Sequence, residues 1–454
     1  MSGSGAVSPA TFPADFIWGA ATSAYQIEGG RNEEGKADSI WDRFSDQGRL
    51  RHPGDVACDH FHRWEQDLDL LAALGVNAYR FSVSWPRVIP DGDDWVNQAG
   101  LDFYRRLVAG LRDRGIAPVV TLYHWDLPQA LQDKGGWASR ATVGAFARYA
   151  RVVAGALGAE TGRWVTQNEP WVAAMLGHRD GIFPPGIQDW RTAVTVGHHL
   201  LVSHGLATAE IRNVVDDAKV GIALDCRPVE AASDSEQDRD AARHFDGFRN
   251  RWFFDPVFGL GYPDDIMATY VDRNRVDPGL IATDDMRIIA TPIDFLGVNY
   301  YTSVTVGAGG EEIDRPEREP GPEPPPGFTE MGWRVDPEGL ARYLRHLSTT
   351  YGPSSILVSE NGASYSDGPD QHGVIDDQRR IDYLASHVGA VAAARGLGVP
   401  VDGYFVWSLM DNVEWLEGFG QRFGLIWVDE TTLDRTPKRS FEWYRRLVTT
   451  GTLG

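Results

Sequence analysis

The sequence predicts an α/β protein built as a single (β/α)8 TIM barrel, with its active site at the C-terminal ends of the strands. Two observations lead to this fold class. Eight short runs rich in β-branched and aromatic residues occur along the chain, and amphipathic stretches with helical spacing separate them. The periodicity alone would also fit an open, doubly wound sheet. At roughly 150 residues per domain, the length of 454 residues would suggest about three domains, but α/β barrels routinely run longer as one domain.

The expected strands are nearly continuous apolar runs, as in parallel strands that are buried on both faces. They comprise residues 16–22, 78–84, 117–123, 163–168, 219–224, 294–301, 355–360 and 403–409. Expected helices such as 63–75, 103–115 and 143–158 each end in glycine, a frequent helix C-cap. Residues 1–11 are expected to form a flexible tail, and 12–454 the barrel domain. The segment 314–328 carries six prolines among charges and is expected to form a surface loop after the sixth strand.

Composition excludes several classes of protein. The chain has 43 Lys and Arg against 64 Asp and Glu, a formal charge of −21, so a nucleic acid or an anionic membrane is not an expected partner. Two cysteines, Cys58 and Cys226, form no disulfide framework or zinc motif, and neither a secretory signal nor a membrane span is expected. A cytoplasmic location and no metal or organic cofactor are therefore predicted. A homo-oligomer is compatible with this sequence.

In a barrel of this kind, function resides at the C-terminal ends of the strands. The residues that end the expected strands include carboxylates, amides, an imidazole and indoles. No Ser–His–Asp arrangement or Gly-rich phosphate loop is found. This set predicts a site for a neutral ligand rich in hydroxyl groups. The strand-end residues are Gln26, Arg80, His124, Trp125, Asn168, Glu169, Asn299, Tyr301, Glu360 and Trp407, with Glu414 and Trp415 just beyond.

Glu169 and Glu360 end the fourth and seventh strands, which face each other across a barrel mouth. Two carboxyl groups that flank one bond are what glycosidic cleavage requires. One protonates the leaving oxygen, and the other attacks the anomeric carbon or activates a water molecule. A glutamate in an ordinary surface or helix-capping position is the alternative for either residue. That alternative is disfavoured because both end apolar strands and both adjoin an asparagine.

Several motifs resemble those of glycoside hydrolase family 1, the β-glucosidase family. TQNEP (166–170) is similar to the family's acid/base motif and VSENG (358–362) to its nucleophile motif. Further matches follow in family order and span almost the whole chain. They are FIWGAATSAYQIEGG (16–30), GDVACDHFHRWEQDL (54–68), AYRFSVSWPRVIP (78–90), LYHWDLP (122–128), VNYYT (298–302) and WSLMDNVEW (407–415).

The resemblance implies hydrolysis with retention of configuration. Glu169 would be the general acid and then the base, and Glu360 the nucleophile that forms a covalent glycosyl-enzyme. Glu169 should be kept protonated by apolar surroundings and by the charge of Glu360. Glu360 should be kept ionised by Arg80 and Tyr301.

The resemblance also assigns the sugar-binding residues. Gln26, His124, Trp125, Asn168, Glu414 and Trp415 would surround the sugar hydroxyls, Trp407 would stack under the ring, and Asn299 and Tyr301 would order the nucleophile. Trp333 resembles a platform for the aglycone, the group that leaves. Trp171 and Leu176 follow the acid/base motif and are expected to narrow the aglycone channel, which we expect to weaken inhibition by glucose.

The expected substrates are terminal, non-reducing β-D-glucosyl residues of short, cellobiose-like oligosaccharides and of aryl or alkyl β-glucosides. Relatives that act on 6-phosphosugars replace the residue that matches Glu414, and a carboxylate there would repel phosphate. Two alternatives stay open. One is a β-galactosidase or β-fucosidase of the same family, and the other is a catalytically silent sugar-binding protein.

Overall fold

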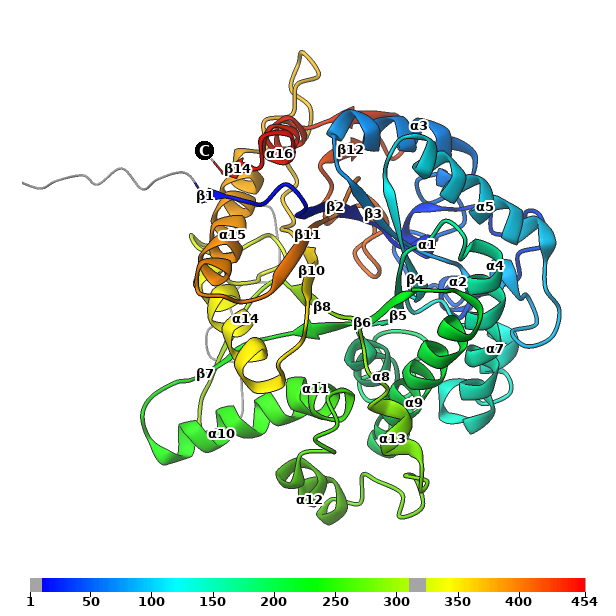
Figure 1. The fold of residues 1–454 in the computed structure, drawn as a ribbon, viewed down its shortest axis with the longest axis vertical. Helices are drawn as coiled ribbons and strands as arrows, with labels where there is room; N and C mark the ends of the chain where they lie inside the picture. The colour runs from blue at the N-terminus through cyan, green and yellow to red at the C-terminus, as the bar shows by residue number, and fades with distance from the viewer. Residues whose placement is uncertain (1–9, 310–323, 454) are drawn as a thin grey trace, which may run out of the picture.

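The computed structural model describes residues 10–309 and 324–453. Eight parallel strands close into a barrel and neighbour one another in chain order, with the last strand pairing to the first (Figure 1). The strands are β2 (Ile17–Ala21), β3 (Ala78–Ser82), β4 (Ala117–Tyr123), β5 (Arg163–Asn168), β6 (Lys219–Cys226), β8 (Phe295–Tyr300), β10 (Ile356–Asn361) and β11 (Val401–Trp407). The predicted fold class is therefore confirmed, and the open doubly wound sheet is excluded.

Long helices follow the strands and form the outer ring of the barrel (Figure 1). They are α3 (His60–Leu74), α5 (Gln98–Asp113), α7 (Arg140–Leu157), α9 (Trp190–Val214), α14 (Pro337–Tyr351), α15 (Gln378–Gly396) and α16 (Arg439–Thr450). The predicted stop at Gly75 is observed, with φ at 80° in the left-handed region that glycine tolerates. None of the helices in the described ranges is both long and apolar enough to cross a membrane.

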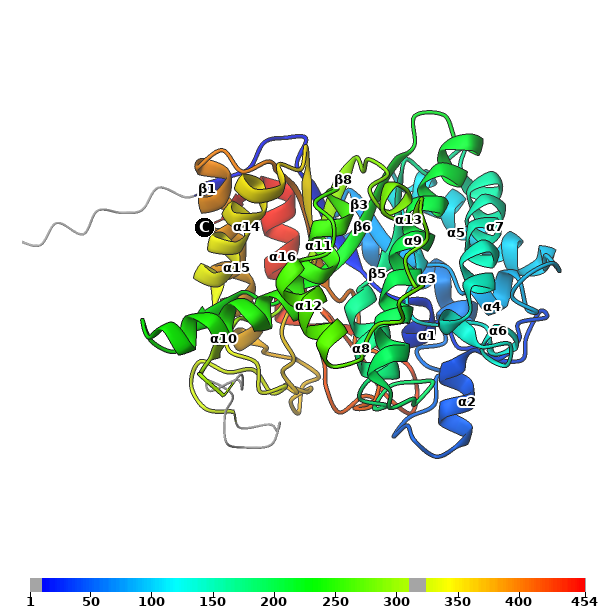
Figure 2. The same ribbon diagram turned by 90° about the horizontal axis from the view of Figure 1, so that it is seen from below.

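Short helices and strand pairs lie between these elements. In Figure 1, α10 and α12 project beyond the ring, and in Figure 2, α1, α2, α8 and α10 lie toward one side of the barrel. The short helices are α1 (Ala24–Ile27), α2 (Ile40–Asp46), α4 (Trp85–Val88), α6 (Gln129–Gln132), η1 (Gly136–Ala138), α8 (Pro170–His178), α10 (Glu236–Asp246), η2 (Gly247–Arg251), α11 (Trp252–Val257), α12 (Asp264–Asp272) and α13 (Asp285–Ile289). The short strands pair as β7 (Val229–Ala231) with β9 (Val304–Val306) and β12 (Ile426–Val428) with β13 (Arg435–Pro437).

The barrel interior is filled by side chains of very different size. Ala21, Ala78 and Ala223 lie among Phe295 and Phe405, all buried, and leave room for the two rings. Gly19 in β2 serves the same purpose, because a Cβ there would lie 2.2 Å from a ring carbon of Phe405. The interior is thus a packed core, and the free space lies above it at the strand ends.

The two ends of the described chain pair with each other. β1 (Ala10–Thr11) runs antiparallel to β14 (Thr452–Leu453). Of the expected tail, residues 1–9 lie outside the described residues, whereas Ala10 and Thr11 belong to this strand pair. Most of the expected proline-rich loop, residues 314–323, also lies outside the described residues.

Candidate active site

A cavity of ≈ 320 Å³ opens at the C-terminal ends of the barrel strands. Its walls combine carboxylates, amides and aromatic rings. Ten of the residues predicted from the sequence line it, and they come from five of the eight barrel strands or the loops that follow them. They are His124, Trp125, Glu169, Asn299, Tyr301, Trp333, Glu360, Trp407, Glu414 and Trp415.

The other three predicted residues lie one hydrogen bond behind this lining. Gln26, Arg80 and Asn168 are buried and contact residues of the cavity wall. Gln26 Nε2 donates to Glu414 Oε2 at 3.3 Å. The backbone carbonyl of Asn168 accepts from Trp125 Nε1 at 2.9 Å. All thirteen predicted residues therefore belong to one site, in two layers.

A continuous hydrogen-bonded chain begins at Glu360. Arg80, on β3, donates to Glu360 Oε1 through one terminal nitrogen and to Asn168 Oδ1 through the other, both at 2.6 Å. Tyr301 donates its hydroxyl to Glu360 Oε2 at 2.6 Å. Both oxygens of the Glu360 carboxylate thus have a strong donor, which is the arrangement that stabilises an ionised carboxyl group.

The same chain continues to Glu169. Asn299 Nδ2 donates to Asn168 Oδ1 at 3.0 Å and to Glu169 Oε1 at 2.8 Å. Ser359 donates its hydroxyl to Asn299 Oδ1 at 2.7 Å, which fixes the orientation of that amide. The two glutamates are therefore held in one rigid network, and the amide of Asn299 orients Glu169 without a cation in contact with it.

Three residues of the cavity wall have a strained backbone conformation. Trp125, Glu169 and Trp415 have positive φ values of 76°, 49° and 44°, which are unfavourable for side chains of this size. All three residues line the cavity. Such strain persists only where the surrounding packing imposes it, and it tends to mark functional sites.

Burial dominates the acid–base properties of Glu169, which is 6% exposed. The pKa of Glu169 is raised well above its usual range, first by burial and then by the negative charges of Asp225 and Glu360. The hydrogen bond from Asn299 and the charge of Arg249 oppose that rise. Glu169 can therefore hold a proton at a pH at which an ordinary glutamate has lost it, as predicted.

Glu360 is equally buried, and burial raises its pKa as well. Here Arg80 and the Tyr301 hydroxyl oppose the rise, because both stabilise the carboxylate. These are the two partners that the sequence predicted. The two glutamates thus share one cavity but differ in their immediate neighbours: a guanidinium and a phenol for Glu360, and a single amide for Glu169.

The hydrogen bonds determine which nitrogen of His124 carries the proton. Asn168 Oδ1 accepts from Arg80 and Asn299, so the Nδ2 group of Asn168 is the donor to His124 Nε2, at 3.1 Å. Burial and the charge of Arg80 lower the pKa of His124 well below its usual value, so the ring is neutral. Nδ1 then carries the hydrogen, and it has no partner among the described residues. It is a donor available to a ligand hydroxyl.

Glu414 lies on the opposite wall as a half-buried carboxyl group. Its pKa is raised to about 8, first by burial and then by the charge of Glu360, while the hydrogen bond from Gln26 opposes the rise. Gln26 is itself fixed, because its Nε2 also donates to Asn412 Oδ1 at 2.9 Å and its Oε1 accepts from Ser23 at 2.6 Å.

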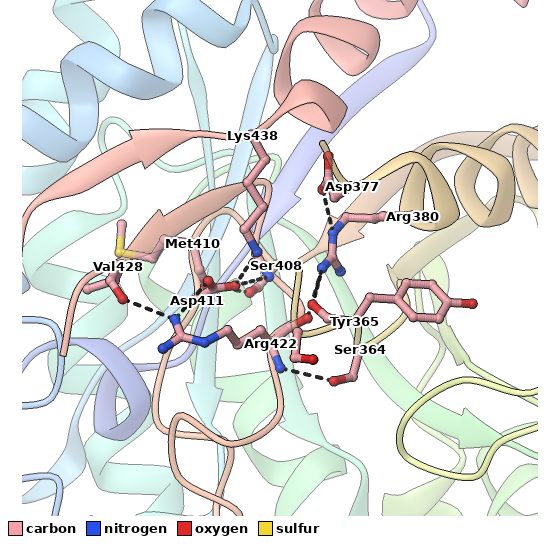
Figure 3. Close-up of polar contacts among 12 residues, drawn as sticks. Ser364, Tyr365, Asp377, Arg380, Ser408, Met410, Asp411, Arg422, Val428 and Lys438 are labelled. Atoms are coloured by element: carbon pink, nitrogen blue, oxygen red, sulfur yellow. Dashed lines mark hydrogen bonds and ion pairs between the residues drawn. The ribbon is translucent and has the colours of Figure 1, made fainter. Parts of the chain in front are cut away.

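A buried ionic cluster supports the loop that carries Glu414 and Trp415. Asp411 accepts from Lys438 Nζ at 2.7 Å and from Arg422 at 3.1 Å (Figure 3). All three side chains are almost inaccessible to solvent. Lys438 precedes α16 and Arg422 lies in the loop after β11, so the cluster ties the active-site loop to the outer ring. A buried charge of this kind needs its partners, because each alone would carry the full cost of desolvation.

Asp225 and Arg249 are among the cavity-wall residues that were not predicted from the sequence. They form a largely buried ion pair, and both affect the pKa of Glu169. Asp225 lies at the C-terminal end of β6, so the rule that selected the other strand-end residues would have found it. Arg249 lies in the π-helical turn η2, for which the sequence shows no comparable signal.

Trp171 and Leu176 of α8 also line the cavity, and their part in an aglycone channel stays a prediction. Within residues 10–309 and 324–453, no group of three or more His, Cys, Asp or Glu side chains is placed to hold a metal ion.

Comparisons with known proteins agree with this site. The model of glycosyl hydrolase family 1 matches residues 8–452. Beta-glucosidase A of Acetivibrio thermocellus is 44% identical over 451 residues, which covers 97% of this chain and 99% of that protein. A bifunctional beta-D-glucosidase/beta-D-fucosidase of Bifidobacterium breve is 42% identical over 464 residues, 96% of this chain and 98% of that protein.

Among solved structures, the beta-glucosidase of Thermotoga maritima in complex with deoxynojirimycin superposes with a TM-score of 0.92 at 42% identity. The superposition covers 98% of this chain and all of that one. The match extends over the barrel and over every strand end that carries the cavity. The chain is a glycoside hydrolase and belongs to glycosyl hydrolase family 1.

Proposed function

We propose that this enzyme is a retaining β-glucosidase in which Glu169 is the acid/base and Glu360 the nucleophile. The observation that carries the proposal is the hydrogen-bonded chain Glu360–Arg80–Asn168–Asn299–Glu169. It supports opposite protonation states for two carboxyl groups in one cavity. Retaining cleavage requires this combination of an ionised nucleophile and a protonated acid.

In the first step, Glu169 gives its proton to the glycosidic oxygen while a Glu360 oxygen attacks the anomeric carbon. The bond from that carbon to the leaving oxygen breaks, the aglycone departs as an alcohol or a phenol, and an ester joins Glu360 to the sugar. The charge states of the two glutamates are now reversed, because Glu169 is ionised and Glu360 is neutral. Because Glu360 is now an ester, it no longer presents a negative charge to Arg80 and Tyr301.

In the second step, Glu169 acts as a base. The charge of Glu360, which raised the pKa of Glu169 in the free enzyme, is absent from the ester. Glu169 then removes a proton from water, the resulting oxygen attacks the anomeric carbon, and the ester bond breaks to free Glu360. Two inversions at one carbon give a product with the configuration of the substrate.

The cavity wall supports a glucosyl residue as the group bound at its base. Three residues that line the cavity supply suitable groups: His124 a donor at Nδ1, Glu414 an acceptor and Trp407 an indole ring. The proposed substrates are terminal β-D-glucosyl residues of short cellulose-derived oligosaccharides and of aryl or alkyl β-glucosides. Trp333, whose ring centroid lies 5.2 Å from that of Tyr301, supports a platform for the aglycone.

β-Fucosidase activity is a second candidate, since the Bifidobacterium breve relative is named for both activities. Relative kcat/KM values on 4-nitrophenyl β-D-glucoside, β-D-fucoside and β-D-galactoside would rank them. A larger value for the fucoside or the galactoside would replace the glucosidase assignment and leave the mechanism in place. Failure to cleave any of the three would favour the sugar-binding alternative.

The nucleophile is tested with Glu360→Gly and added azide. The variant should lose at least about 10³-fold in kcat on aryl β-glucosides, because no covalent intermediate can form. Azide fits the space left by the deleted side chain and attacks from the same face, so it should restore release of the phenol and give an α-glucosyl azide. A β-glucosyl azide from this variant would contradict the role of Glu360.

Glu169→Gly is the matched control, since it deletes the same side chain from the other wall. On 2,4-dinitrophenyl β-D-glucoside, whose leaving group needs no acid, the glycosyl-enzyme should still form and then persist. Azide should resolve it from the opposite face and give a β-glucosyl azide. On substrates with a poor leaving group, we expect kcat to fall by about 10²–10⁴-fold.

We also propose a cytoplasmic location, where this enzyme would complete the breakdown of imported cellulose fragments. Two buried free thiols, Cys58 and Cys226, fit a reducing compartment. Cell fractionation with activity assays of each fraction tests the location, and activity found mainly outside the cells would overturn it.

A further inference from the structure

A second cavity of ≈ 540 Å³ lies beside the active site, under α10, η2 and α12. The described residues that line it include five arginines, one histidine and five aromatic rings, and no Asp or Glu. That lining is unexpected in a chain with a formal charge of −21. The arginines are Arg179, Arg227, Arg249, Arg273 and Arg275, and the rings are those of Trp171, Trp190, Phe245, Phe248 and Tyr270.

The two cavities share part of their walls. Trp171, Arg227 and Arg249 line both of them, so these side chains form a wall that the two cavities share. Trp171 is two residues beyond Glu169, at the start of α8. Since Glu169 protonates the leaving oxygen in the proposed mechanism, the aglycone lies on this side of the scissile bond. A long aglycone would therefore be directed past Trp171 into the second cavity.

The cations of this cavity are only partly compensated. Arg249 is paired with Asp225, and Arg179 with Asp180 at 2.5 Å. Arg273 and Arg275 form no ion pair with any described residue. Each arginine also lies near others of like charge, and the pKa of Arg275 is lowered by burial and by the charges of Arg273 and Arg179. An anion in this cavity would meet a positive potential.

The aromatic rings of this cavity are packed against its guanidinium groups. The guanidinium of Arg275 lies 3.6 Å from the ring centroid of Trp190, and that of Arg249 lies 3.6 Å from the ring centroid of Trp171. The indole nitrogen of Trp171 and Nε of Arg249 are buried donors without a hydrogen-bond partner in the described part of the chain. Alternating rings, guanidinium groups and free donors suit an aromatic acid, whose ring stacks while its carboxylate pairs.

We infer that this second cavity is a distal aglycone site that selects β-glucosides whose aryl aglycone carries a carboxylate. The inference rests on the proposed function, since it places the aglycone on the Glu169 side. It extends that function from the sugar, which the first cavity binds, to the chemistry of the leaving group. Arg273 and Arg275 supply the charge selection, and the aromatic lining supplies apolar contact for the aryl group.

The test compares pairs of substrates that differ only in charge. Phenyl β-D-glucosides with a para ethyl, butyl or hexyl chain are made with either a terminal carboxylate or a terminal amide. The saturated chain insulates the phenol, so both members of a pair have nearly the same leaving group. The measured quantity is the ratio of kcat/KM for the acid to kcat/KM for the amide, at low and high salt.

In the native enzyme, at least one chain length should give a ratio of about threefold or more, expressed mainly in KM and reduced by salt. The double variant Arg273→Gln/Arg275→Gln should bring the ratio close to one and leave kcat/KM on unsubstituted phenyl β-D-glucoside unchanged. Arg106→Gln, which removes an exposed positive charge from α5, is the matched control and should leave the ratio as it is in the native enzyme.

Equal cleavage of acid and amide at every chain length would overturn the inference, as would a preference that survives in the double variant. Neither result would touch the proposed glucosidase activity, which the unsubstituted phenyl glucoside reports separately. Failure to cleave any member of the series, together with phenyl β-D-glucoside, would instead overturn the proposed function.

Discussion

Single hydrogen bonds distinguish the two catalytic glutamates. Each of these bonds can be removed by deleting one chemical group. Tyr301→Phe deletes the hydroxyl that donates to Glu360 Oε2 at 2.6 Å and keeps the ring that packs on Trp333 and Phe423. Without this donor the carboxylate is less stable, so the pKa of Glu360 should rise. The acidic limb of the kcat/KM profile, where Glu360 must be ionised, should move to higher pH.

The measurement is kcat/KM on an aryl β-glucoside against pH. Tyr444→Phe is the control, since it deletes another buried hydroxyl hydrogen bond, to the carbonyl of Gly19, outside the cavity. An acidic limb that stays in place in Tyr301→Phe would show that Tyr301 does not set the charge of Glu360.

Asp225→Asn should move the basic limb of the pH profile of kcat/KM. The negative charge of Asp225 raises the pKa of Glu169, while Arg249, its ion-pair partner, lowers it. Neutralising Asp225 removes the effect that raises the pKa of Glu169 and leaves the effect of Arg249 that lowers it, so this pKa should fall. The basic limb of kcat/KM, where Glu169 loses its proton, should move to lower pH.

The control is Asp402→Asn, which removes a half-exposed carboxylate from β11 and should leave both limbs in place. A basic limb that moves to higher pH in Asp225→Asn would contradict the assigned charge coupling.

At the residue scale, the sequence predicted which residues form the site better than whether each of them lines the cavity or lies behind its lining. The strand-end rule placed Glu169, Glu360 and their neighbours together, because parallel strands end at one face of a barrel. It could not show that Arg80 and Asn168 lie behind the lining. The position of these two side chains depends on their direction and on their hydrogen bonds. Those hydrogen bonds join residues up to 280 positions apart in the sequence.

The elements of the barrel are held by buried ionic contacts as well as by apolar packing. Asp411, after β11, lies between Arg422 and Lys438, and the three charges are shielded from water. Asp411→Asn would leave the buried cation of Lys438 without its carboxylate partner, whereas Arg422 would keep its ion pair with Glu430 at 2.7 Å. We expect a loss of about 3–5 kcal/mol in stability, the cost typical of an uncompensated buried charge.

Thermal unfolding followed by circular dichroism measures this loss. Asp376→Asn is the matched control because Asp376 forms an ion pair with Arg439 at 2.8 Å on the surface, where both side chains are more than half exposed. Such pairs contribute about 0–1 kcal/mol. Equal melting temperatures for the two variants would show that the buried cluster adds no stability.

At the scale of elements, the eight barrel strands were predictable to within about two residues. Runs such as APVVTLY, which is β4 as observed, are apolar throughout because both faces of a barrel strand are covered. The helices were predicted to begin too late: α5 begins at Gln98, five residues before the expected start at 103. Its first turn contains exposed Gln98, the small residues Ala99 and Gly100 and a single large apolar residue, Leu101, so hydrophobic periodicity does not reveal it.

At the scale of the whole molecule, neither thiol is accessible in the folded protein. Cys58 and Cys226 are 0% and 5% exposed, and burial raises the pKa of each thiol. A thiol reagent such as 5,5′-dithiobis(2-nitrobenzoate) should therefore modify neither group in the native enzyme and both in urea. Rapid modification without denaturant, with loss of activity, would show that the wall around Cys226 opens.

The pairing of β1 with β14 has a practical consequence for how this enzyme can be handled. β1 precedes β2 at the face of the barrel opposite the strand ends that carry the cavity, as Figure 2 shows by the position of β1 relative to α1 and α8. Both chain ends therefore leave from the rear of the molecule and start side by side. A fusion partner, an immobilising tag or a short peptide that joins the two ends into a circle would leave the mouth of the active site unobstructed.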